Sequence, residues 1–259
     1  MCEIFCFNSN KPKEVNECLE CFYNHSDEHP HGWGLATMQS DEFVIQKEPM
    51  KASCSQHLKD ILSNPVIGKN VFAHIRLATV GEIISPNCHP FIEADDNNRS
   101  WMLIHNGTIF DFPGLDKYEE SENGDTDSER ILLYIIDKVN EFEKEKNAPS
   151  TIKERFDLLT GVVTDLSKGN KLNLMIYDGD LTYIHSNMKD TLFYLKNDEE
   201  FLIASTPLDD DENWKNVELN KLFGLIDGEI IFESEAHDNE FVLTEAHEKI
   251  LNDFLQSLD

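Results

Sequence analysis

The chain has 259 residues, 40% of them hydrophobic, and its 22 basic and 50 acidic side chains give a formal net charge of −28. This length allows a folded core, and the charge argues against nucleic acid and anionic membrane surfaces as partners. The sequence has neither a signal peptide nor a run of roughly 20 apolar residues for a membrane helix, so we expect a cytoplasmic protein whose six cysteines are thiols.

Along the first half of the chain, apolar spacing predicts a helix and then buried strands. The helix begins soon after Pro12, and its apolar positions are Val15, Cys18, Leu19 and Phe22. Residues 71–78 are short, apolar and close to Gly81, which predicts a buried strand. Residues 101–105 predict another strand, which runs directly into Asn106-Gly107.

The second half predicts two helices, then several strands, then a closing helix. An apolar stripe from Ile131 to Phe142 marks the first of these helices. Thr151 and Glu154 form a capping-box pattern at the start of the next helix. Strand-like runs follow at 172–177, 181–185, 191–195 and 201–204, with hairpin signals at 178–179 and 227–228 and apolar helical spacing at 250–258.

This order of elements predicts an α+β protein with largely antiparallel sheets and helices packed on their outer faces. We find no internal repeat and no linker rich in Pro, Gly or Ser, so residues 1–259 are expected to form one compact domain.

Cys2 is the first candidate for chemistry. Removal of Met1 would place a thiol and a free α-amine on one residue, which is a complete nucleophile and base. Taken alone, a single cysteine is more often a small buried hydrophobic residue.

His74 and Arg76 lie on one face of the predicted strand 71–78 because side chains alternate along a strand. A buried arginine requires a partner. That partner is either a structural carboxylate, the commoner case, or a substrate carboxylate bound through the guanidinium fork.

Asn106 and Gly107 could donate a side-chain and a backbone hydrogen bond to one oxygen, as in an oxyanion hole. Taken alone, Asn-Gly is better explained as a hairpin turn. Likewise, Gly32-Trp33-Gly34 indicates either a close backbone approach or an ordinary turn, and Asp127 either caps the following helix or binds a substrate ammonium. His89 is held extended by the proline that follows it.

Taken together, these pieces resemble the class II glutamine amidotransferases of the N-terminal-nucleophile hydrolase superfamily, and most of all their stand-alone branch without a fused synthase. The matching segments, in order, are 1–3, 31–34, 73–81, 87–91, 105–107, 126–129 and 204–208. One departure is His31, where relatives often carry Asp, and no role is assigned to it.

The resemblance implies a four-layer αββα sandwich of two mostly antiparallel sheets. It also implies that Cys2 is the nucleophile and that Asn106 and Gly107 form the oxyanion hole. The substrate-binding positions that it implies are Arg76 for the α-carboxylate, Asp127 for the α-ammonium, and Thr79 and His89 in the pocket wall.

The implied reaction is attack of the Cys2 thiolate on the γ-amide of glutamine or a γ-glutamyl compound, followed by hydrolysis of a γ-glutamyl thioester. No metal and no organic cofactor is expected. Two alternatives remain open: a glutaminase subunit that supplies ammonia to a separate synthase or amidase partner, and a non-catalytic binding or regulatory module that keeps the fold.

Overall fold

The computed structural model describes residues 2–39 and 42–257. It contains two facing sheets, and strand β1 (Glu3–Glu14) lies in the middle of the first. This seven-stranded sheet has the order β11-β9-β10-β1-β4-β2-β3, and its paired strands are antiparallel. The other strands are β2 (Gly32–Gln39), β3 (Glu42–Glu48), β4 (Ile67–Arg76), β9 (Phe193–Lys196), β10 (Glu200–Ala204) and β11 (Lys215–Asn216).

The second sheet has six strands in the order β13-β12-β8-β7-β6-β5, again with antiparallel pairs. Its strands are β5 (Phe91–Ala94), β6 (Ser100–Thr108), β7 (Lys171–Tyr177), β8 (Thr182–His185), β12 (Leu222–Ile226) and β13 (Glu229–Glu233). The expected hairpins at 178–179 and 227–228 join β7 to β8 and β12 to β13.

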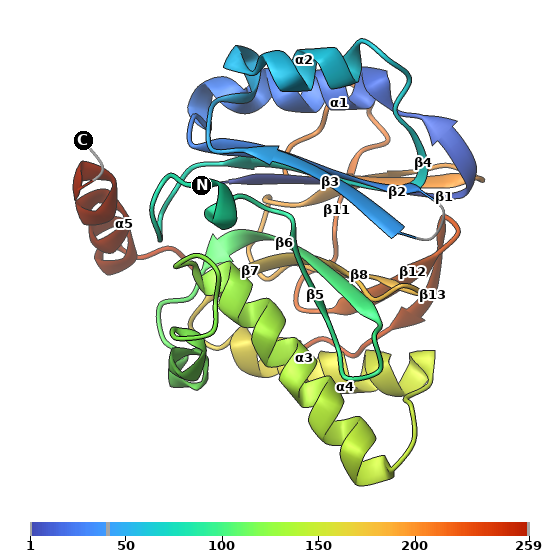
Figure 1. Ribbon diagram of the computed structural model, residues 1–259, viewed down its shortest axis with the longest axis vertical. Coiled ribbons are helices and arrows are strands. Elements are labelled where there is room, and N and C mark those ends of the chain that lie inside the picture. Colours follow the sequence, from blue (N-terminus) through green and yellow to red (C-terminus); the bar gives the residue numbers. More distant parts are fainter. Residues whose placement is uncertain (1, 40–41, 258–259) are drawn as a thin grey trace.

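Helices cover the outer face of each sheet, so the layers are αββα as expected (Figure 1). Helices α1 (Asn16–Asn24) and α2 (Gln56–Leu62) lie over the seven-stranded sheet, whereas α3 (Asp127–Lys146) and α4 (Ile152–Leu166) lie over the six-stranded sheet. The closing helix, α5 (Glu245–Ser257), stands to one side of these layers (Figure 1).

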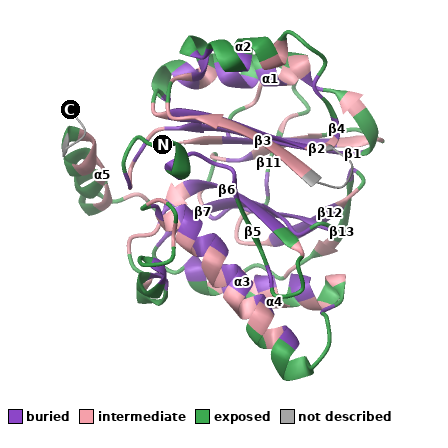
Figure 2. Ribbon diagram, in the orientation of Figure 1, coloured by how far each residue is buried: buried purple, intermediate pink, exposed green. Residues whose placement is uncertain are grey.

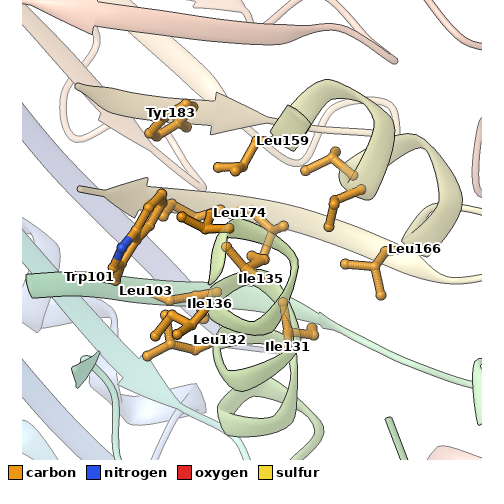
Figure 3. Packing of buried hydrophobic residues seen from close by; sticks show 14 of the residues in the cluster. Trp101, Leu103, Ile131, Leu132, Ile135, Ile136, Leu159, Leu166, Leu174 and Tyr183 are labelled. Carbon is orange, nitrogen blue, oxygen red and sulfur yellow. The ribbon is translucent and has the colours of Figure 1, made fainter. Parts of the chain in front are cut away.

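The alternation of side chains along each strand divides the core into three layers. On β1, Ile4 and Cys6 point between the two sheets, whereas Phe5 and Phe7 point toward α1 and α2. The interlayer space is lined by buried strands (Figure 2). Under the second sheet, β6 and β7 pack Leu103 and Leu174 against α3 and α4 (Figure 3).

The helix predictions are confirmed. Thr151 caps α4 with the complete capping box that the sequence predicts. At the start of α3 the cap is Thr126, whose hydroxyl accepts from the Glu129 N–H at 3.3 Å. Of the two roles left open for Asp127, the helix cap is therefore not the one it has.

At two places where a turn was one of the alternatives, the structure has a strand. Gly32-Trp33-Gly34 begins β2, and Asn106-Gly107 lies within β6, where these residues pair with Asn173 and Leu172. The close approach explains Gly34, because a Cβ there would lie 1.8 Å from the His89 carbonyl oxygen. The strand expected at 71–78 ends at Arg76.

No helix among the described residues is both long enough and apolar enough to cross a membrane.

Candidate active site

The candidate catalytic side chains meet at one end of the space between the sheets. Cys2 precedes β1 on the same face as Ile4, and Asn106 follows Met102 and Ile104 on the inward face of β6. Arg76 ends β4, which is antiparallel to β1, so its end lies beside the start of β1. Strand alternation and antiparallel register therefore bring together residues that are far apart in the sequence.

Cys2 is half-buried, and its thiol donates to the Leu77 carbonyl at 3.4 Å. Burial raises the pKa of this thiol. The N-terminal charge, the Leu77 hydrogen bond and the positive charges of Arg76 and Lys171 act in the opposite direction. The thiol is therefore mostly protonated at neutral pH, and a base is needed to form the thiolate.

The Asn106 amide is held at both of its ends. Its Nδ2 donates to the Ser205 hydroxyl at 3.0 Å, and its Oδ1 accepts from the Lys171 amine at 3.0 Å. Ser205 also accepts from the Ile4 N–H at 3.0 Å, so one hydroxyl joins Asn106 to the start of β1, two residues after Cys2. This bridge brings the expected oxyanion donor to the strand that carries the expected nucleophile.

Only glycine fits at position 107. A Cβ there would lie 2.0 Å from the Lys171 carbonyl oxygen and 2.2 Å from His105 Nε2. His105 points away from the interlayer space, toward α3, where its Nδ1 lies 3.0 Å from the Ser128 hydroxyl. The narrow gap between β6 and β7 therefore fixes the backbone of the Asn-Gly pair.

Arg76 is buried, and its guanidinium donates to backbone carbonyls rather than to a structural carboxylate. The acceptors are Glu82 at 2.8 Å, Val80 at 2.9 Å and Gly81 at 3.1 Å. Among the described residues, no hydrogen bond joins Arg76 to a carboxylate, so the structural ion pair that the sequence left open is not found. Three of the five guanidinium N–H groups are used in this way, which leaves two for a ligand carboxylate.

Thr79 lies in the segment that follows β4, and its hydroxyl is 3.2 Å from the Thr108 hydroxyl at the end of β6. The same segment is fixed by His31, whose Nδ1 accepts from the Ala78 N–H at 2.9 Å. His31, to which the sequence assigned no role, therefore helps to set the path of the backbone next to Leu77 and Cys2.

His89 is buried and stacks on His74, with ring centroids 4.0 Å apart. Burial lowers the pKa of both imidazoles well below the usual value. The charge of Arg76 acts in the same direction on His74, and the neighbouring His74 does so on His89. The two rings are therefore neutral at pH 7 and form an uncharged wall close to Arg76.

Asp127 is the first residue of α3. Its Oδ2 accepts from the Ile109 N–H at 2.8 Å, and its Oδ1 accepts from the Ser128 hydroxyl at 3.3 Å. It lines a cavity of about 290 Å³ together with Phe110, Phe112 and Arg130. None of the other expected site residues lines this cavity.

Lys171 and Ser205 were not predicted as site residues. Ser205 belongs to a matched segment but carries no chemical signal of its own, and Lys171 immediately precedes the predicted strand 172–177. A lysine at the start of a wholly buried strand was the available signal.

Among the described residues, no group of three or more His, Cys, Asp or Glu side chains could hold a metal ion.

A family model described as glutamine amidotransferases class-II matches residues 1–197. An uncharacterised protein of Methanocaldococcus jannaschii is 29% identical over an alignment that covers 97% of this chain and 75% of that protein.

Two solved structures have a similar fold. One is a predicted glutamine amidotransferase from Pseudomonas aeruginosa, at a TM-score of 0.64 and 20% identity, with 89% of this chain and 99% of that one covered. The other is the glutamine phosphoribosylpyrophosphate amidotransferase of Bacillus subtilis, at a TM-score of 0.65 and 18% identity, with 92% of this chain and 50% of that one covered.

Proposed function

Because the chain belongs to the class II glutamine amidotransferases, we propose that it hydrolyses the γ-amide of glutamine or of a γ-glutamyl compound, with Cys2 as the nucleophile. The observation that carries this proposal is the Ser205 bridge, which joins Asn106 to the start of β1 through two hydrogen bonds of 3.0 Å. Family membership supports the reaction type, and the bridge supports the assignment of the reacting groups.

In the proposed reaction, loss of Met1 frees the α-amine of Cys2, which accepts the thiol proton directly or through a water. The sulfur attacks the γ-carbonyl carbon. The resulting oxyanion accepts from the Gly107 N–H and from the Asn106 Nδ2 hydrogen that Ser205 does not use. The leaving amine takes a proton from the α-ammonium of Cys2, and water then hydrolyses the thioester to release glutamate.

We infer the mode of substrate binding from two charged side chains, Arg76 and Asp127. We assign the glutamyl α-carboxylate to Arg76, which has two N–H groups beyond those that hold the carbonyls of residues 80–82. The α-ammonium is assigned to Asp127, whose cavity is lined by several acidic side chains. Thr79 and His89 complete the wall between them.

The test is glutamate release from L-glutamine and from a series of γ-glutamyl peptides, with protein whose mass confirms the loss of Met1. Cys2→Ala is expected to abolish release, whereas Cys54→Ala, at an exposed position, should leave it unchanged. Preferential cleavage of one peptide would identify the leaving group. No release from any compound, with Cys2 free, would contradict the hydrolase proposal.

A second candidate function is delivery of ammonia to a separate synthase. The support for it is that this chain corresponds to only half of the Bacillus subtilis amidotransferase chain. A larger complex on size exclusion of the native extract, with glutamine as the preferred amide, would favour this role. A protein that runs alone and prefers a γ-glutamyl peptide would contradict it, and a catalytically inert one would leave a binding module.

A further inference from the structure

Lys171 is buried at the start of β7, where desolvation of its amine costs free energy. It begins β7 opposite Thr108 of β6, and its residue surface is only 2% exposed. Leu172 and Leu174 point toward the helices, so Lys171 points in the other direction, into the space between the sheets. Burial of an amine disfavours its ammonium form, so the hydrogen bonds that the amine makes inside the protein matter for its charge and its position.

The hydrogen bond to Asn106 gives this amine such a use. An ammonium only donates, so the atom of Asn106 that lies 3.0 Å from the Lys171 nitrogen must be the carbonyl oxygen. The amide nitrogen is thereby fixed on the opposite side, where it donates to Ser205. Without Lys171, the amide could rotate and present its oxygen to the reacting group.

We propose that Lys171 is a positioning residue of the amide hydrolysis, which fixes the Asn106 amide as a donor and keeps a positive charge at the Cys2 end of the interlayer space. This inference rests on the proposed function. In the reaction, Lys171 touches neither the leaving group nor the carbonyl carbon, and it acts on the oxyanion through Asn106.

The charge balance around the thiol supports the second part. Besides the N-terminal amine, the cations that act on Cys2 are Arg76 from β4 and Lys171 from β7, and Cys88 also interacts with it. Burial lowers the pKa of Lys171 to about 8, and the Cys2 thiolate opposes that change. His105, on the other face of β6, also interacts with Lys171 but is neutral at pH 7 because burial lowers its pKa.

The experiment compares Lys171→Met and Lys171→Gln with the wild type in two assays, on protein that has lost Met1. One is glutamate release. The other is the rate of Cys2 alkylation by iodoacetamide against pH, followed by mass spectrometry of the N-terminal peptide. Lys168→Met is the matched control, since that lysine lies three residues earlier on the surface and pairs with Asp165.

For Lys171→Met we expect kcat to fall roughly tenfold to hundredfold, less than for loss of an oxyanion donor, with KM nearly unchanged. The alkylation profile should move to higher pH by about one unit. Lys171→Gln keeps an N–H donor without the charge, so it should show the same alkylation shift with a smaller loss of kcat. Lys168→Met should match the wild type in both assays.

An unchanged alkylation profile in Lys171→Met and Lys171→Gln would overturn the proposal, because a residue that only fills space alters folding without moving the titration of Cys2. A wild-type kcat in Lys171→Met would overturn it equally. If the wild type releases no glutamate, the proposed function fails, and the alkylation profile alone then decides whether Lys171 acts on Cys2.

Discussion

At the scale of single residues, Asn106 gives the sharpest expectation. Asn106→Ala removes one of two proposed oxyanion donors, so kcat for glutamate release should fall by roughly 10²–10³. Asn197→Ala, in an exposed turn, serves as the control and should keep the wild-type rate. Cys2 in Asn106→Ala should still react with iodoacetamide. A near-normal kcat would contradict the assignment of Asn106 to the oxyanion.

Ser205 has a predicted effect on stability. Its hydroxyl accepts from the Ile4 N–H and from Asn106, and Ser205→Ala would leave both buried donors without this acceptor. The free energy of unfolding should fall by about 1–3 kcal/mol. Ser121→Ala removes an exposed hydroxyl that donates to the Tyr118 carbonyl and should stay within about 0.5 kcal/mol of the wild type in urea unfolding. Equal stability of the two variants would refute the bridge.

The sequence indicated the candidate site residues but not the contacts that hold them. Residue type made Cys2, Arg76 and Asn106 candidates, and the ordered resemblance to the class II amidotransferases gave them their expected roles. The Lys171 contact depends on the pairing of β6 with β7, and the Ser205 contact depends on how the two sheets are stacked. No local spacing encodes either of them. The hairpin interpretation of Asn106-Gly107 failed because β7, far along the chain, pairs with both residues.

At the scale of elements, the C-terminal segment joins the sandwich at a few defined contacts. The Phe241 N–H donates to the Asn187 carbonyl at 2.7 Å, and His237 Nε2 lies 3.0 Å from His185 Nε2. Beyond them, α5 is attached through His247, whose ring lies 4.4 Å from that of Phe110. The segment before α5 is therefore anchored to the sandwich at Phe241 and His237, whereas α5 stands to one side of it.

Two truncations test this division. A chain that ends at Thr244 loses α5 and the His247 ring contacts, and its free energy of unfolding should fall by about 1 kcal/mol. A chain that ends at Glu235 also loses the partners of Asn187 and His185 and should fall by several times as much, at about 1–3 kcal/mol per buried polar group. Equal urea midpoints for the two truncations would contradict the division.

Elements with a strong local pattern were predicted well, and elements defined by pairing were not. The stripe of α3, the capping box of α4 and the Asp-Gly hairpins are local features, and the structure confirms them. Strand β1 continues through the polar residues 8–14 because β4 pairs with it on both sides of an irregularity. Such pairing overrides the weak strand propensity of this segment.

At the scale of the whole molecule, buried neutral histidines govern the response to acid. Burial lowers the pKa of His74 and His89 well below the usual value, and that of His185 to about 3. In the unfolded chain these groups titrate near about 6.5. Protonation therefore favours the unfolded state, so the stability they contribute is present above pH 6.5 and is lost as the pH falls below it.

Urea unfolding at pH 7 and pH 5 measures this effect apart from the carboxylates, which titrate mainly near about pH 4. For each of the three histidines, the free energy of unfolding should fall by about 2 kcal/mol between pH 7 and pH 5. In His185→Gln, this fall in the free energy of unfolding should be smaller than in the wild type by about the contribution of one histidine. The exposed His57→Gln should show the same fall as the wild type. A free energy of unfolding that is constant or higher at pH 5 would contradict the prediction.

The position of α5 also decides how the protein can be purified and labelled. An affinity tag fused ahead of Met1 would keep the Cys2 amine in a peptide bond, so the tagged protein should lack the proposed activity. Helix α5 stands to one side of the sandwich (Figure 1), and its Ile250 is 55% exposed. A tag, dye or surface linker joined after this helix should therefore leave both sheets and the thiol undisturbed.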